Sequence, residues 1–411
     1  MQTIQWRACT AAILFTTFTA ALAADTPAAV PEADAALKAS YLNNLASVYS
    51  SEAKYVAAEE HYRKALELWQ QKPGNETSVA LVLNNLGVLL RREARYSEAE
   101  IVDLQALKML EQLLGPDHEK TATALSNLGE LYCMQGRLVE AEASLRRGLA
   151  IMEKAHGKDH PDTAIPLSGL ADIARRQGKN EAAQQLLERA LGIVEKALGP
   201  MHARAAPILN NLAAVYDQQH KYKEAQRTVQ RAITIFDRTA GPNHPDTAAA
   251  LINLAAIDLD RHKYREAMEL NRRALKINES TLGPIHPVIA TSLNNMGAVS
   301  FALHDYRQAT SLFQQTLANW EKADSPNRAL VGDTLRNLGM VYQAERQDQR
   351  ALECYARAIS VHEAALGPND PRLIADLEAY ADELRRVNDY AEAEKASVRA
   401  LGIQVRNSLH P

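Results

Sequence analysis

The segment Pro207–Tyr216 reads PILNNLAAVY and carries the pattern that decides the fold. Its apolar residues follow the i, i+3, i+4, i+7 spacing of one helix face, and they are Leu209, Leu212, Ala213 and Tyr216. The polar segment DQQHKY comes next, and a second amphipathic segment, KEAQRTVQRAITIF, follows it. Because a lone helix hairpin cannot bury both of its apolar faces, the pattern predicts that several hairpins stack on one another.

The same block recurs along the whole chain. The residue equivalent to Leu212 recurs at an interval of 41 residues once and of 42 residues thereafter, as Leu45, Leu86, Leu128, Leu170, Leu212, Leu254, Met296, Leu338 and Tyr380. A small residue always follows it, and an alanine always stands twelve residues later, as Ala58, Ala99, Ala141, Ala183, Ala225, Ala267, Ala309, Ala351 and Ala393. A larger side chain at such a close helix contact would cost about 1–3 kcal/mol. The repeat predicts an all-α solenoid of about nine helix hairpins.

Composition excludes several classes of function. The chain has 411 residues, a formal net charge of −4 and 5% aromatic residues, which argues against a nucleic-acid-binding surface. There is no G-x-S-x-G, P-loop, dinucleotide or H-E-x-x-H motif, so we predict neither an enzyme nor a cofactor site.

The N-terminus differs from the repeats. A short basic segment precedes the apolar stretch Ala8–Leu22, and Ala21-Leu22-Ala23 fits the small-x-small cleavage pattern. We therefore predict a signal peptide at 1–23, a flexible linker at 24–36 and the repeat array at 37–407. The alternative is a generic apolar tail. The prediction places the mature protein outside the cytoplasm, periplasmic or secreted if bacterial, with no membrane insertion after signal cleavage.

Two cysteines remain in the predicted mature chain, Cys133 and Cys354. They lie five repeats apart, so an extended array would keep them too distant to form a disulfide. Neither has the sequence spacing of a metal ligand or a catalytic nucleophile.

The repeats resemble a known family. The pattern L-x-x-L-[GA]-x-x-Y, followed by Ala and then A-[LI], is similar to the tetratricopeptide repeat, and the 42-residue form resembles the repeats of kinesin light chain. The resemblance covers about Leu37 to Val405. It implies a right-handed superhelix of helix hairpins whose concave groove binds peptide segments.

A second periodic feature lies between the repeats. Segments such as LGPDHEKT (114–121) and AGPNHPDT (240–247) contain one histidine per repeat, at His118, His160, His202, His244 and His286. One interpretation is a row of metal ligands. The other is a helix-to-helix connector in which Gly ends one helix, Pro prevents its continuation and Asp or Thr caps the next helix. The 42-residue period places one histidine in each layer, so neighbouring histidines are separated by about the thickness of a helix pair. Zinc needs ligand nitrogens about 2 Å from the metal, so adjacent layers could hardly share an ion, and the connector is favoured.

The asparagines of the quoted segment have no role in its apolar face. Asn211 lies about 150° from the centre of that face, on the side that a hairpin array would turn toward its concave surface. Its equivalents are Asn44, Asn85, Asn127, Asn253, Asn295 and Asn337. Because a carboxamide both donates and accepts, such a row can pair with the backbone of an extended peptide. The resemblance implies that role here. The alternative is that each asparagine bonds a neighbouring helix and serves the stack alone.

Basic pairs at the ends of first helices are further candidates for the groove. We predict that Arg91, Arg92, Arg175 and Arg176 bind an acidic segment or its carboxylate, and the alternative is a solvated helix end. The sequence thus predicts a monomeric, exported interaction scaffold whose partner is an unidentified protein or peptide. The alternative function is a structural or assembly subunit of an envelope complex that binds through its convex face or its ends.

Overall fold

A computed structural model describes residues 35–71, 74–322 and 328–409. The predicted signal peptide at 1–23 and most of the predicted linker at 24–36 lie outside these residues. The irregular connector of the eighth repeat also lies largely outside them. The first described helix begins at Ala35, within the predicted linker.

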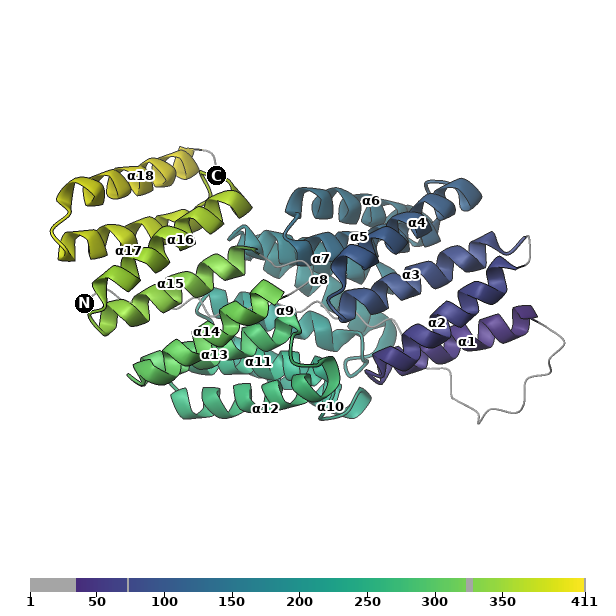
Figure 1. Ribbon diagram of the computed structural model, residues 1–411. Coiled ribbons are helices and arrows are strands. Elements are labelled where there is room, and N and C mark those ends of the chain that lie inside the picture. The colour runs from purple at the N-terminus through teal and green to yellow at the C-terminus, as the bar shows by residue number, and fades with distance from the viewer. Residues whose placement is uncertain (1–34, 72–73, 323–327, 410–411) are drawn as a thin grey trace. The chain divides into compact units, whose positions relative to one another are not determined.

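The described residues form helices and contain no strand (Figure 1). The first helices of the nine repeats are α1 (Ala35–Ser51), α3 (Glu76–Arg92), α5 (Glu119–Gln135), α7 (Ala164–Arg176), α9 (Ala205–Gln218), α11 (Pro245–Asp260), α13 (Pro287–Ala302), α15 (Arg328–Ala344) and α17 (Arg372–Arg386). The second helices are α2 (Tyr55–Gln70), α4 (Tyr96–Leu114), α6 (Leu138–His156), α8 (Asn180–Leu198), α10 (Tyr222–Thr239), α12 (Tyr264–Leu282), α14 (Tyr306–Lys322), α16 (Asp348–Leu366) and α18 (Tyr390–Leu409). One 3₁₀ turn, Pro161–Thr163, precedes α7. The prediction of an all-α solenoid of nine hairpins is confirmed.

The helices belong to two compact units. Among the described residues, one consists of 258–276 and those from 284 to 409, and the other of those from 35 to 257 and 277–283. Within each unit, a first helix packs on the second helix of its own repeat, and that second helix packs on the first helix of the next, as in α15, α16 and α17. First helices of consecutive repeats also contact each other, as α3 and α5 do. The first helices therefore form one continuous layer within a unit.

The small residues of the repeat lie at the helix contacts. A Cβ atom on Gly129 of α5 would lie 2.6 Å from Cγ of Leu145 on α6, and one on Gly339 would lie 2.6 Å from Cε1 of Tyr355. The repeated alanines, from Ala58 to Ala351, are fully buried. Both observations confirm the predicted close approach of the two helices in a hairpin.

The segments between repeats that contain the histidines are helix-to-helix connectors, as one of the two interpretations predicted. Gly115 and Gly157 end α4 and α6 with φ angles of 98° and 88°, in the left-handed region that favours glycine. The predicted Asp or Thr cap is wrong, because it is the histidine side chain that accepts a backbone N–H near the start of the next helix. The Nδ1 atom of His118 accepts from the N–H of Lys120 at 3.1 Å, and the four other histidines make the equivalent bond at 3.1–3.3 Å.

Candidate functional site

The predicted asparagines form inter-repeat hydrogen bonds, which we call the asparagine ladder. In each bond, Nδ2 of an asparagine donates to Oδ1 of an asparagine of the preceding repeat, one position earlier in the motif. The four donor and acceptor pairs, with their distances, are Asn85 to Asn43 (3.1 Å), Asn127 to Asn84 (3.0 Å), Asn253 to Asn210 (2.9 Å) and Asn337 to Asn294 (3.2 Å). These bonds lie along the layer of first helices and connect consecutive repeats.

The acceptors of the ladder were not predicted as site residues. Asn210 and its equivalents vary along the chain, which made them look less important than Asn211 and its equivalents. Their signal is the doublet NN, which occurs at 43–44, 84–85, 210–211 and 294–295, each time with an asparagine at the second position of the next repeat. A ladder bond forms in all four cases.

Two of the predicted asparagines have no such partner. Asn211 is 4% exposed and Asn295 is fully buried, and neither atom of either carboxamide has a hydrogen-bond partner in the part of the chain that the structure describes. The sequence explains why, because the acceptor position of the preceding repeat carries Ser168 in one case and Ile252 in the other. Asn44, in the first repeat, is exposed, and its Oδ1 accepts from Asn43 at 3.4 Å.

The arginines predicted near repeat two are buried and bonded within the stack. An ion pair of 2.7 Å joins Arg91 to Glu130 of the next repeat, and Arg91 also donates to the carbonyl of Asn127 at 2.8 Å. Arg92 donates to the carbonyl of Ser50 in the preceding repeat at 3.1 Å. These side chains therefore connect α3 to its neighbours on both sides.

The arginines predicted near repeat four share one carboxylate. Arg175 and Arg176 bind the two oxygens of Asp172 at 2.8 and 2.7 Å, and Asp172 is buried. Burial alone would raise the pKa of Asp172, but the charges and hydrogen bonds of Arg176 and Arg175 outweigh it and hold this pKa below its usual value. The prediction that these arginines bind a ligand carboxylate is not tested by these contacts, but each side chain already has an internal partner.

The described residues contain no group of three or more His, Cys, Asp or Glu side chains that could hold a metal ion. Cys133 and Cys354 are both free thiols. Within the residues that the structure places, no helix combines the length and the apolar character needed to span a bilayer.

Comparison with known proteins agrees with the geometry. The family model of the tetratricopeptide repeat matches residues 37–112, 78–154, 120–196, 198–280, 288–360 and 330–404. No curated protein sequence matches the chain closely enough to count as a relative.

Several solved structures are similar to this chain. A Rap protein complexed with Competence and Sporulation Factor is 17% identical, with a TM-score of 0.55, and the match covers 82% of this chain and all of the other. The BtubC (BKLC) protein from P. vanneervenii is 22% identical over 57% of this chain and 92% of its own, with a TM-score of 0.44. A kinesin light chain-like protein from Podosopora anserina is 24% identical over 50% of this chain and 98% of its own, with a TM-score of 0.40. The family model spans nearly all of the described residues, and the chain therefore belongs to the tetratricopeptide-repeat family.

Proposed function

We propose that this chain is a non-enzymatic scaffold that binds extended segments of partner proteins along the layer of first helices, in the groove that the family resemblance predicts. Membership of the tetratricopeptide-repeat family supports the role of protein–protein interaction scaffold. The observation that carries the finer proposal is the pair of buried, unpartnered carboxamides at Asn211 and Asn295. The predicted signal peptide stays a prediction, and it would place the partners among exported proteins.

A peptide backbone can supply the hydrogen-bond partners that these two carboxamides lack. A buried polar group without a hydrogen bond costs about 1–3 kcal/mol, and most such groups in native proteins have a partner. An extended segment offers one N–H and one C=O per residue, which match the acceptor and the donors of a carboxamide. A segment bound at either asparagine would have to displace the side chains that cover it, and the hydrogen bonds gained there would offset that displacement.

The asparagines that donate ladder bonds have a different role from Asn211 and Asn295. The Nδ2 atoms of Asn127 and Asn253 are already used between repeats, so these residues hold the register of the first helices. A Rap protein with the same fold was solved in complex with Competence and Sporulation Factor, which supports binding of a ligand by a solenoid of this type.

Replacing Asn211 and Asn295 together with alanine tests the proposal. We expect the full chain to bind members of an array of ten-residue peptides. The double variant should weaken that binding at least about tenfold, which is 1.4 kcal/mol, for all bound sequences alike, because the lost bonds are to backbone. The measurement is fluorescence anisotropy with the labelled peptides.

Asn127→Ala is the matched control for this experiment. Removing its side chain should lower the free energy of unfolding by about 1–3 kcal/mol, because it leaves Asn84 without its donor. Its effect on peptide affinity should be much smaller than that of the double variant. Equal loss of affinity in the control, or unchanged affinity in the double variant, would contradict the proposal.

A second candidate function is self-assembly through the C-terminal end. Val398 and Leu401 lie three residues apart on α18 and are 63% and 59% exposed, whereas the equivalent of Leu401 in the preceding repeat, Ile359, is 8% exposed. Interior repeats cover this position with the next first helix, as α17 covers α16. A second copy of the chain would cover the same apolar surface on α18.

Sedimentation velocity distinguishes the two candidates. If the end face mediates assembly, the full chain should show a concentration-dependent dimer that Leu401→Lys abolishes. Val139→Lys is the control, because Val139 is 81% exposed on α6, in the other compact unit. A chain that stays monomeric across the concentration range rules out this candidate.

A further inference from the structure

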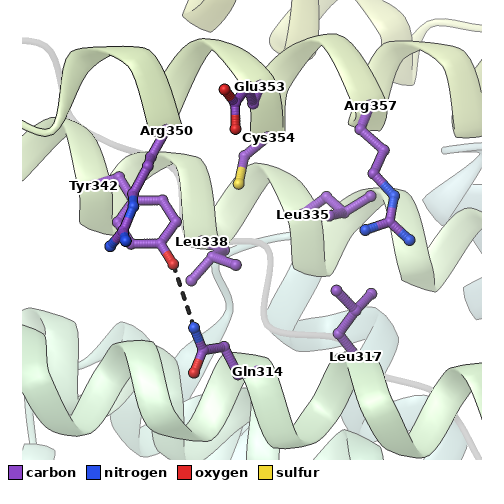
Figure 2. Close-up of a pocket in the computed structure, with 9 residues that line it drawn as sticks. All are labelled: Gln314, Leu317, Leu335, Leu338, Tyr342, Arg350, Glu353, Cys354 and Arg357. Carbon is purple, nitrogen blue, oxygen red and sulfur yellow. Dashed lines mark hydrogen bonds between the residues drawn. The ribbon is translucent and has the colours of Figure 1, made fainter.

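A groove of ≈ 370 Å³ lies among α14, α15 and α16, which belong to the same compact unit (Figure 2). Leu317 of α14 and Leu335 and Leu338 of α15 give it an apolar lining. Figure 2 shows Cys354 pointing into this space from α16, with Arg350 at one side of it and another arginine at the other. The volume is near the lower end of the range of ligand pockets, about 300–1,000 Å³.

The side chain at the position of Cys354 is smaller than in several other repeats. The position of Cys354 carries leucine in three other repeats, at Leu186, Leu270 and Leu312. A thiol is smaller than an isobutyl group, so it leaves space between α14 and α16. Burial raises the pKa of the Cys354 thiol to about 11, and the uncharged thiol therefore adds to the apolar lining.

The charge at the groove is also altered relative to other repeats. Arg350 stands where five other repeats carry glutamate, at Glu98, Glu140, Glu224, Glu266 and Glu392. Its guanidinium donates to Oε1 of Gln347 at 2.8 Å and lies 5.5 Å from the ring centroid of Tyr342. No carboxylate in the described residues forms an ion pair with Arg350.

The second arginine at the groove differs from Arg350 in this respect. Arg357 forms an ion pair of 2.8 Å with Glu321 of α14. The guanidinium of Arg350 is therefore the cationic group that remains open to a carboxylate from outside. The acidic residue in the lining, Glu353, accepts from Gln349 at 3.3 Å.

We propose that this groove binds a segment of a partner protein in which a leucine-sized apolar side chain is adjacent to an aspartate or glutamate. The apolar side chain would lie against Leu317, Leu338 and Cys354. The neighbouring carboxylate would form a charge-assisted, bidentate pair with Arg350. The site is separate from the asparagine ladder, because its lining contains none of the ladder asparagines and its cation is on the second helix α16.

Titration of the full chain with short peptides tests this site. The probe is the tetrapeptide Gly-Leu-Asp-Gly, blocked at both ends, and the readout is the methyl NMR spectrum of the leucines. We expect saturable shifts of the Leu317, Leu335 and Leu338 methyl signals. The peptide Gly-Leu-Lys-Gly should bind at least about tenfold more weakly, because its charge is reversed.

Two variants test whether the peptide binds in the groove. Cys354→Leu restores the side chain of other repeats and should fill the groove, and Arg350→Glu restores their charge. Each should weaken binding of the Leu-Asp peptide at least about tenfold while the chain stays folded by circular dichroism.

Two matched controls make the same changes elsewhere. Ser144→Leu alters the position equivalent to Cys354 in the third repeat, and Arg227→Glu alters an exposed arginine on α10. Neither should change the affinity. Unchanged affinity in Cys354→Leu, equal binding of the lysine peptide, or shifts confined to leucines outside the groove would each overturn the proposal.

Discussion

Replacing Asp376 with alanine should lower the free energy of opening of the last two repeats by about 3–5 kcal/mol, the usual cost of removing one partner from a buried ion pair. Asp376 of α17 is fully buried, and its Oδ1 accepts from Nη1 of Arg336 on α15 at 2.8 Å. Its Oδ2 bonds with Nδ1 of His362 on α16. One carboxylate thus connects three helices. Without it, two buried cationic groups would share Asp333, which lies 2.7 Å from Arg336 and 3.7 Å from Nε2 of His362.

Native-state hydrogen exchange measures this effect locally, since repeat proteins open in parts. The amides of α15 to α17 should lose protection, whereas those of α3 to α6 should not. Glu378→Ala is the control, because this exposed residue lies on the same helix and its loss should change stability by less than about 0.5 kcal/mol. A similar effect in both variants would contradict the role of Asp376.

The same cluster predicts a dependence of stability on pH. Nε2 of His362 lies 2.8 Å from the carbonyl oxygen of Ala329, which can only accept, and Nδ1 faces Asp376. Burial lowers the pKa of His362, but the hydrogen bond and charge of Asp376 and the charge of Asp333 outweigh it, so this pKa lies above its usual value. The stability that the imidazolium contributes is then fully present below the unfolded-state pKa of about 6.5 and is lost as pH rises through the folded-state pKa.

The difference in stability between the wild type and His362→Gln should therefore be largest at acid pH and shrink in alkali. A difference that grows with pH would contradict the charged state of His362.

The repeat pattern predicted the hairpins because one period fixes both the helix faces and the small residues at their contacts. The 42-residue interval is enough to predict that Leu212, Ala213 and Ala225 are buried, and the structure confirms it. The repeat period alone does not reveal the donors and acceptors of the ladder. The bond from Asn253 depends on the residue one position earlier in the preceding repeat, Asn210, and the doublet NN is the sequence signal for it.

The repeat pattern does not predict the partners of residues that depart from it. His362 occupies a position that carries Trp69, Leu110 or Phe236 in other repeats, and the sequence alone gave it no partner. Its space comes from Gly332 of α15, where a Cβ atom would lie 2.4 Å from Nε2 of His362. Such clusters arise from coincident substitutions on three helices, and only the packed helices show which substitutions meet.

Asp103 is a departure of the same kind, and its replacement by leucine should stabilise the protein. Asp103 of α4 is 1% exposed, and neither carboxyl oxygen has a hydrogen-bond partner in the described chain. It packs against Gly87 of α3, where a Cβ atom would lie 1.8 Å from Oδ1. The equivalent contact in the next repeat pairs Gly129 with Leu145, so the fold already accommodates a leucine in this arrangement.

The pKa of Asp103 determines how its contribution to stability changes with pH. Burial, together with the charge of Glu130, raises the pKa of Asp103 to about 7 against the attraction of Arg91. For an acid whose pKa is raised on folding from about 3.8, stability is greatest at low pH and is lost as pH rises through the folded-state value. Ionised Asp103 therefore destabilises the folded chain at alkaline pH.

Asp103→Leu should accordingly raise the free energy of opening of α3 and α4 by about 2–4 kcal/mol at pH 8.5 or so, and its advantage over the wild type should be smaller by about 2–3 kcal/mol near pH 5. Asn271→Leu is the matched control, because Asn271 is buried at the equivalent position of the sixth repeat and does not titrate. Any gain from that variant should not depend on pH. If Asp103→Leu gives the same gain at both pH values, ionisation of Asp103 is not the source of the instability, and if it destabilises α3 and α4, the buried carboxyl has a partner that offsets its cost.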